Sequence, residues 1–135
     1  MDDRVHRHSV RVYYEDTDAG GIVYHTAYLR FAERGRTECL RVCGFDHGTL
    51  REEAGGGFVV REMAIDFRAA ASLDDELVVS TNVRDVSGTS VRMEQNVMRG
   101  DDTLVRLDVK LAFLSPSGRP GRIPPGVRQA FLNRE

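Results

Sequence analysis

The chain has 135 residues, of which 41% are hydrophobic and 30% are charged, and its formal net charge is −2. This length is typical of one domain, so we expect a single domain over residues 1–135. The composition excludes a disordered chain and a membrane-spanning protein, and the scattered basic residues argue against a nucleic-acid partner. The segment Met1–His8 lacks the apolar core of a secretion signal, which favours a cytoplasmic protein.

The first elements in chain order are a strand, a tight loop and a long helix. His8–Glu15 is rich in β-branched and aromatic residues and predicts a strand, and Asp16–Gly21 has the composition of a turn. Apolar and small residues then recur at steps of three and four, which predicts one helix. Its buried stripe consists of Tyr28, Phe31, Ala32, Gly35, Cys39, Val42 and Cys43.

Three small residues shape this helix. Gly44 is expected to end it. Ala32 and Gly35, in the middle of the stripe, predict that a sheet approaches the helix closely.

The only cysteines, Cys39 and Cys43, lie four residues apart in the same predicted helix. Their side chains leave the helix in nearly parallel directions, so a disulfide between them is geometrically poor. The pair also lacks the number and spacing of ligands that a zinc site requires. We therefore expect reduced, structural cysteines and no bound metal.

The second half of the chain has the pattern of a sheet. Asp46–Glu53 predicts a short helix, and Gly55–Gly57 predicts a hinge or loop. The predicted strands are Phe58–Arg68, Glu76–Val86, Ser90–Arg99 and Leu104–Leu114. Pro124 and Pro125 favour a last short helix that runs to Glu135.

This order of elements predicts an α+β fold. A curved antiparallel sheet wraps around one long helix, and the last three strands form a meander. One helix leaves the edges of such a sheet open. We therefore expect two or more copies of the chain to pair, edge to edge, as a homo-oligomer.

The segment Tyr14–His25 concentrates acids, glycines and a histidine between the first strand and the long helix. The first N–H groups of a helix have no partner within the helix, so they can stabilise a carbonyl oxygen that gains negative charge. Asp18 is the best placed carboxylate for attack on a thioester or for activation of water, and His25 can orient substrate or carry a proton. Turn or cap roles for Asp16 and Asp18 explain the same residues, and spacing alone leaves both interpretations open.

Other kinds of site do not fit this segment. In a calcium loop that starts at Asp16, the fifth and twelfth positions are Gly20 and Ala27, which supply no ligand. Neither glycine cluster has the spacing or the lysine of a P-loop. The chain also lacks the Gly-x-Ser-x-Gly motif of a serine hydrolase.

The run Val10–His25, followed by Tyr28 and by Glu33-x-x-Arg36, resembles the signature of the YbgC-type acyl-CoA thioesterases. These belong to the 4-hydroxybenzoyl-CoA thioesterase family of the hot-dog superfamily. The similarity continues through Phe58–Arg61 and Leu73–Asp75 to Gly88–Ser90. It therefore covers most of the chain.

This resemblance implies a hot-dog fold, with a five-stranded antiparallel sheet around one long helix, and dimers or tetramers whose active sites lie between subunits. It implies hydrolysis of acyl-CoA, with Asp18 as nucleophile or general base and the His25 N–H as the donor to the thioester carbonyl. The His25 ring and Tyr14 match residues implicated in activity. No cofactor is expected, since coenzyme A is part of the substrate.

The resemblance also implies that the nucleotide end of coenzyme A lies near the turn formed by Gly88, Thr89 and Ser90. Only Arg84 and Arg92 are nearby in sequence to hold its phosphates. Acyl carrier protein is a further expected partner, and genes of this type often accompany the Tol-Pal envelope system.

Glu33 and Arg36 lie one helical turn apart, which predicts a surface ion pair. Tyr24 and Tyr28 are interpreted as core or interface aromatics. Two other functions stay open beside hydrolysis. One is a hot-dog enoyl-CoA hydratase or dehydratase, and the other is a non-catalytic acyl-carrier or envelope-associated module.

Overall fold

The computed structural model describes residues 4–135. The strands are β1 (His6–Arg11), β2 (Gly57–Phe67), β3 (Glu76–Val86), β4 (Ser90–Arg99) and β5 (Asp102–Leu114), and the helices are α1 (His25–Val42), α2 (His47–Ala54) and α3 (Pro125–Leu132). A 3₁₀ helix, η1, spans Tyr14–Asp16. The first three residues of the Met1–His8 segment lie outside the described part of the chain.

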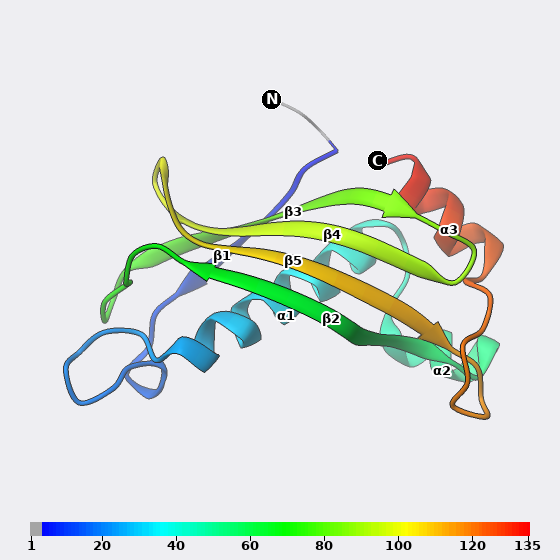
Figure 1. Cartoon of the computed structure of the whole chain (residues 1–135), viewed down its shortest axis with the longest axis horizontal. Coiled ribbons are helices and arrows are strands. Elements are labelled where there is room, and N and C mark those ends of the chain that lie inside the picture. The colour runs from blue at the N-terminus through cyan, green and yellow to red at the C-terminus, as the bar shows by residue number, and fades with distance from the viewer. Residues whose placement is uncertain (1–3) are drawn as a thin grey trace.

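All five strands form one antiparallel sheet in the order β1-β3-β4-β5-β2. The predicted meander of the last three strands is confirmed. Figure 1 shows α1 lying across one face of the sheet, with the loop before α1 at one end and α2 and α3 at the opposite end. Because α1 packs mainly on β1, β3 and β4, the inner face of β2 is left less covered.

The helix α1 buries one face against the sheet, as its periodicity predicts. A methyl group added at Gly35 would lie 2.8 Å from Cγ1 of Val79, so only a glycine permits this approach of helix and strand. Cys39 is buried and Cys43 is half-buried, and both are free thiols. The prediction is wrong for Val42, which is exposed because it lies on the side of the last turn that faces away from the sheet.

The predicted strand His8–Glu15 is wrong at both ends. The strand is β1, which ends at Arg11, and the chain then turns through η1. The backbone N–H of Tyr13 donates a hydrogen bond of 2.9 Å to Oδ2 of Asp16. This local bond competes with the ladder of a sheet and overrides the β propensity of the tyrosines.

The remaining boundaries agree closely with the sequence patterns. The carboxylate of Asp46 caps α2 by accepting the N–H of Thr49 at 2.8 Å. The Gly55–Gly57 segment is less of a loop than predicted, since Gly57 is the first residue of β2. Gly44 follows Cys43, the C-cap residue of α1, with a φ of +94°, the left-handed conformation expected of a residue that ends a helix.

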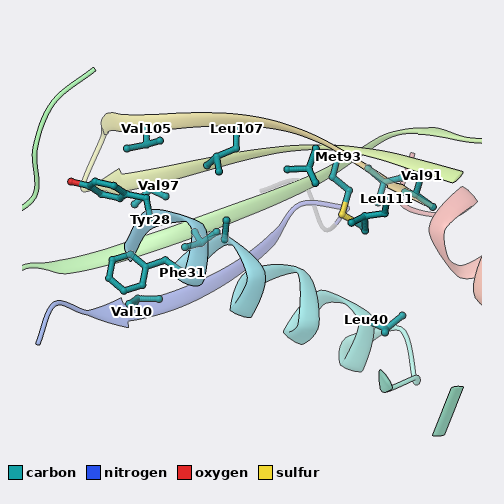
Figure 2. Packing of buried hydrophobic residues seen from close by; sticks show 14 of the residues in the cluster. Val10, Tyr28, Phe31, Leu40, Val91, Met93, Val97, Val105, Leu107 and Leu111 are labelled. Carbon is teal, nitrogen blue, oxygen red and sulfur yellow. The ribbon is translucent and has the colours of Figure 1, made fainter. Parts of the chain in front are cut away.

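The hydrophobic core lies between α1 and the inner face of the sheet. Figure 2 shows Tyr28 and Phe31 on α1 facing side chains of the sheet, among them Val97, Val105 and Leu107. Alternate residues along β3, β4 and β5 supply that face, in the pattern of strands with one buried side. In the described part of the chain, no helix has the length and apolar character needed to cross a membrane.

Candidate active site

The loop before α1 folds back on itself as a short ladder. The N–H of Tyr24 donates to the carbonyl of Asp16 at 2.9 Å, and the N–H of Asp18 donates to the carbonyl of Ile22 at 2.9 Å. Between them, Thr17 and Val23 form an antiparallel bridge. Ile22, the partner of Asp18, lies three residues before His25, so about 10 Å of extended chain separates the backbone of Asp18 from the start of α1.

Asp16 is the structural acid of this loop. Its side chain is only 6% exposed. One carboxylate oxygen accepts the N–H of Tyr13, and the other lies 3.3 Å from Nη2 of Arg30 on α1. With both oxygens in use, Asp16 fixes the loop to the helix and is not available to a substrate.

Asp18 has a different environment. It is exposed, and its Oδ1 accepts the N–H of Gly20 at 2.8 Å. This bond is the turn role that the sequence left open, and it orients the carboxylate. Within residues 4–135, no group donates a hydrogen bond to Oδ2, so that oxygen is available for chemistry.

The start of α1 supplies donors near this carboxylate. Tyr24 precedes the helix and provides no side-chain cap. None of the described residues accepts a hydrogen bond from the N–H groups of His25 or Thr26. These amides and the positive end of the helix dipole can therefore bind an oxygen that carries negative charge.

The ring of His25 is exposed and packs on aromatic neighbours. Its centroid lies 4.4 Å from that of Tyr24 and 6.4 Å from that of Phe67, the last residue of β2. The structure thus brings the end of β2 to the start of α1. Phe67 was not among the predicted site residues, because it approaches His25 only through the tertiary fold.

Tyr14 lies at the start of η1 with 83% of its surface exposed. Its carbonyl accepts hydrogen bonds from the N–H and Oγ1 of Thr17. No contact of its ring with Asp18 or His25 is present among the described residues. The structure therefore brings Asp18 and His25 into one region and leaves the ring of Tyr14 facing solvent.

Tyr28 anchors the loop before α1 through Ala71. Its hydroxyl oxygen accepts the N–H of Ala71 at 2.9 Å, and burial raises the pKa of this phenol. The carbonyl of Ala71 in turn accepts the N–H of Val23 in the loop. Tyr28 was predicted as a core or interface aromatic, and the structure places it in the core, where its hydroxyl needs an internal partner.

The turn Gly88–Ser90 lies at the opposite end of the sheet, between β3 and β4. Oγ of Ser87 accepts the N–H groups of Thr89 and Ser90, so these amides are already in use. Arg84, expected nearby as a cation, is held by Glu94 at 2.8 Å. Arg128 of α3 reaches the same turn and donates to the carbonyl of Ser87 at 3.1 Å. The sequence did not predict this contact, because the two residues are 41 positions apart.

The predicted ion pair between Glu33 and Arg36 is wrong. Nη1 of Arg36 instead donates to Oε1 of Gln95 at 3.0 Å. Nε2 of this buried glutamine donates to the carbonyl of Ala32 and to Oγ1 of Thr81. Arg36 turns inward because β4 offers an acceptor that would otherwise be buried without a donor.

Comparison with known proteins places this chain in a family. The Thioesterase superfamily model matches residues 20–106. The chain is 49% identical over 123 residues, 90% of each chain, to the acyl-CoA thioesterase YbgC of Haemophilus influenzae. It is 39% identical over 133 residues to the acyl-CoA thioester hydrolase YbgC of Escherichia coli, covering 97% of this chain and 98% of the relative.

A solved structure agrees with these sequence matches. The probable thioesterase from Bartonella henselae superposes with a TM-score of 0.86 at 39% identity, covering 89% of this chain and 99% of that one. The predicted resemblance and the predicted sheet around one helix are both confirmed. This chain belongs to the thioesterase superfamily and has the hot-dog fold.

Proposed function

We propose that the chain hydrolyses acyl-CoA thioesters to a free acid and coenzyme A, with Asp18 as the catalytic carboxylate. The observation that carries this proposal is the short ladder that joins a carboxylate with an unused oxygen to a helix start with unused N–H groups. The names of the YbgC relatives support acyl-CoA as the substrate class.

In this mechanism the thioester carbonyl oxygen accepts the N–H of His25 at the start of α1. Asp18 either attacks the carbonyl carbon or removes a proton from a water that attacks it. The oxygen gains negative charge, which the helix amides stabilise. The C–S bond then breaks, the thiolate of coenzyme A leaves and takes up a proton, and water supplies the new oxygen of the acid.

The rings of His25 and Tyr14 have supporting roles in this proposal. His25, whose ring packs against those of Tyr24 and Phe67, orients the thioester over the helix start. Tyr14 is exposed on η1, so we propose that it contacts the substrate in a pocket that also covers η1. A second subunit that completes the pocket would provide that cover.

The test is thiol release from a panel of acyl-CoA substrates, measured for wild type and Asp18→Asn. We expect Asn to lower kcat by about 10²–10⁴-fold, because it can neither attack nor accept a proton. Asp101→Asn is the matched control, since Asp101 is an exposed aspartate in the turn between β4 and β5. Equal rates for wild type and Asp18→Asn would reject the catalytic role.

The same panel separates the alternatives. Hydration of a 2-enoyl-CoA without thiol release would identify a hydratase. Tight binding of acyl carrier protein with neither reaction would identify a non-catalytic module. Either outcome replaces hydrolysis as the function.

The two roles of Asp18 differ in where the new oxygen comes from. In a single turnover in ¹⁸O-labelled water, a general base delivers ¹⁸O directly into the product acid. A nucleophile forms an anhydride first, and ¹⁸O then appears on Asp18 when water attacks the carboxyl carbon of that residue. Mass spectrometry of the product and of the peptide that contains Asp18 distinguishes them.

We further propose that two copies pair along β2, which is an edge of the sheet. Val60 on this strand is 45% exposed, and Val59 and Phe67 are exposed as well. An edge strand that pairs with itself across a two-fold axis is antiparallel. Sedimentation velocity should show a dimer or tetramer, and a monomer at micromolar concentration would contradict this pairing.

We propose that the nucleotide end of coenzyme A binds at the turn Gly88–Ser90. Arg84 is held by Glu94 at 2.8 Å, whereas the contact of Arg92 with Glu62 is longer, at 3.7 Å, so the cations that we propose for the phosphates are Arg92 and Arg128. Alanine at both positions should raise KM with little change in kcat. Acyl carrier protein as a partner and a cytoplasmic location stay predictions.

A further inference from the structure

A cavity of about 300 Å³ lies between the C-terminal half of α1 and the start of β2. Its mouth includes the exposed Val60, whereas its far wall consists of buried side chains. These are Leu40, Met93, Leu111 and Phe131, each at most 7% exposed. In Figure 2, Met93 and Leu111 project from the sheet on the side where Leu40 lies on α1.

The helix α1 is in tight contact with the sheet beside the cavity. At Gly35 the helix backbone and Val79 of β3 are in tight contact. Farther along, Leu40 faces β4 and β5 across the cavity, and α3 closes the end with the ring of Phe131. Phe131 is fixed there by Phe58, with ring centroids 5.8 Å apart.

We propose that this cavity binds an aliphatic acyl chain of the substrate, and that Leu40 and Phe131 set the longest chain that fits. This inference rests on the proposed function and names the substrate class of that same site. The far wall is wholly apolar, so a hydroxyl or carboxylate at the end of the chain would be buried there without a partner. The volume lies at the lower end of the range of about 300–1,000 Å³ found for small-molecule sites, which favours chains of limited length.

The cavity does not adjoin the proposed catalytic residues of its own chain. Glu33, at the mouth, follows His25 by eight residues, which is about 12 Å along the helix axis. Pairing of two copies along β2 removes this gap. In an antiparallel pair, the start of β2 in one copy lies beside the end of β2 in the other.

The end of β2 is where Phe67 meets His25. The mouth at Val60 would therefore open beside Asp18 of the partner subunit. A thioester held there can place its carbonyl at one helix start and its acyl chain in the neighbouring cavity. Polar groups at the mouth have partners of their own. Oγ1 of Thr37 lies 3.4 Å from Nε2 of His47, and Arg36 donates to Gln95. They therefore do not need a polar group on the acyl chain.

The first experiment measures kcat/KM for straight-chain acyl-CoA substrates from two carbons to sixteen. Each methylene that the cavity buries should raise kcat/KM by about 4-fold, until the chain reaches Phe131. Phe131→Ala should move the optimum to longer chains, and Leu40→Phe should move it to shorter ones. The same optimum in wild type and both variants would overturn the proposal.

The matched control is Phe113→Leu. Phe113 is buried and packs on Phe58 with ring centroids 5.2 Å apart, but it does not line the cavity. This variant should lose stability and keep the wild-type optimum. If Phe131→Ala does not fold, Leu40→Phe and the control still decide the question.

A binding measurement separates failure of the cavity assignment from failure of the proposed hydrolysis. S-alkyl-CoA thioethers cannot be hydrolysed, so their binding to the Asp18→Asn protein by calorimetry reports on the cavity alone. Affinity should rise about 4-fold per methylene up to the same limit, and Leu40→Phe should shorten that limit. Chain-length-independent binding would overturn the cavity assignment even where hydrolysis is intact.

Coexpression of Asp18→Asn and Leu40→Phe chains tests whether the two residues act from different copies. With the longest substrate that wild type accepts, neither variant alone should be active. Random pairing gives heterodimers with one intact site in half of the molecules, so about a quarter of wild-type activity should return. Activity no higher than in the separate variants would overturn the placement of the chain beside Asp18 of the partner subunit.

Discussion

The N–H of Ala71 donates a hydrogen bond of 2.9 Å to the hydroxyl oxygen of Tyr28, which connects the segment after β2 to the first turns of α1. The carbonyl of Ala71 accepts the N–H of Val23, so the loop that contains Asp18 is joined to the same point. A residue in the hydrophobic stripe of the helix therefore positions the loop that contains Asp18.

Tyr28→Phe should lower the free energy of unfolding by about 1–3 kcal/mol, because the buried N–H of Ala71 loses its acceptor. Urea denaturation followed by circular dichroism measures this change. Tyr24→Phe is the control, since Tyr24 is half exposed and has no hydroxyl hydrogen bond to the described residues. It should change stability by less than about 0.5 kcal/mol. Equal effects of the two substitutions would contradict the role of this bond.

Asp16→Ala should destabilise the loop, because it leaves the N–H of Tyr13 and the guanidinium of Arg30 without their partner. We expect a loss of about 1–3 kcal/mol. Arg30→Ala should cost about 1 kcal/mol or less, since Arg30 is half exposed and the N–H of Tyr13 keeps its acceptor. A double-mutant cycle measures the coupling of the pair, and zero coupling would show that the ion pair contributes nothing.

Gly35→Ala should lower the free energy of unfolding, because the added methyl group overlaps Val79. We expect the overlap to cost about 1–3 kcal/mol. The higher helix propensity of alanine offsets about 1 kcal/mol of that cost. In the Val79→Ala background this overlap disappears and only the milder approach to Nε2 of Gln95, at 3.2 Å, and to Oγ1 of Thr81 remains, so the same substitution should cost less than in wild type. Gly44→Ala should cost about 1–2 kcal/mol in either background, because its cost lies in the φ of +94°. Identical behaviour of the two glycines would contradict the steric explanation.

Asp75 should make stability depend on pH. The N–H of Ser72 and then the guanidinium of Arg99 lower the pKa of this carboxyl below its usual range. A lowered folded-state pKa means that stabilisation is present above the unfolded-state pKa of about 4 and is lost as pH falls through the folded value. Denaturation midpoints of wild type and Asp75→Asn should therefore differ at pH 7 and converge as the pH falls below about 4. A difference that persists unchanged at pH 2 would exclude this linkage.

Much of the fold follows from local patterns. The period of two along β3, β4 and β5 and the period near 3.6 along α1 identify the elements, because burial on one face imposes these spacings on the sequence. The boundaries of β3 and β4 agree residue for residue with the prediction. The failure at Tyr13 and Tyr14 has a local cause, since the hydrogen bond from Tyr13 to Asp16 competes with strand formation.

The sequence by itself determined that an acidic, glycine-rich loop precedes a long helix, and with it the choice of Asp18 and the start of α1 as a candidate site. Only the tertiary structure decided that Asp16 is buried by Arg30 while one oxygen of Asp18 stays available, because fourteen residues separate Asp16 from its partner. It likewise placed Phe67 against His25, Arg36 on Gln95 and Phe131 at the end of the cavity. Each of these contacts joins residues that are distant in the chain, so no local periodicity records it.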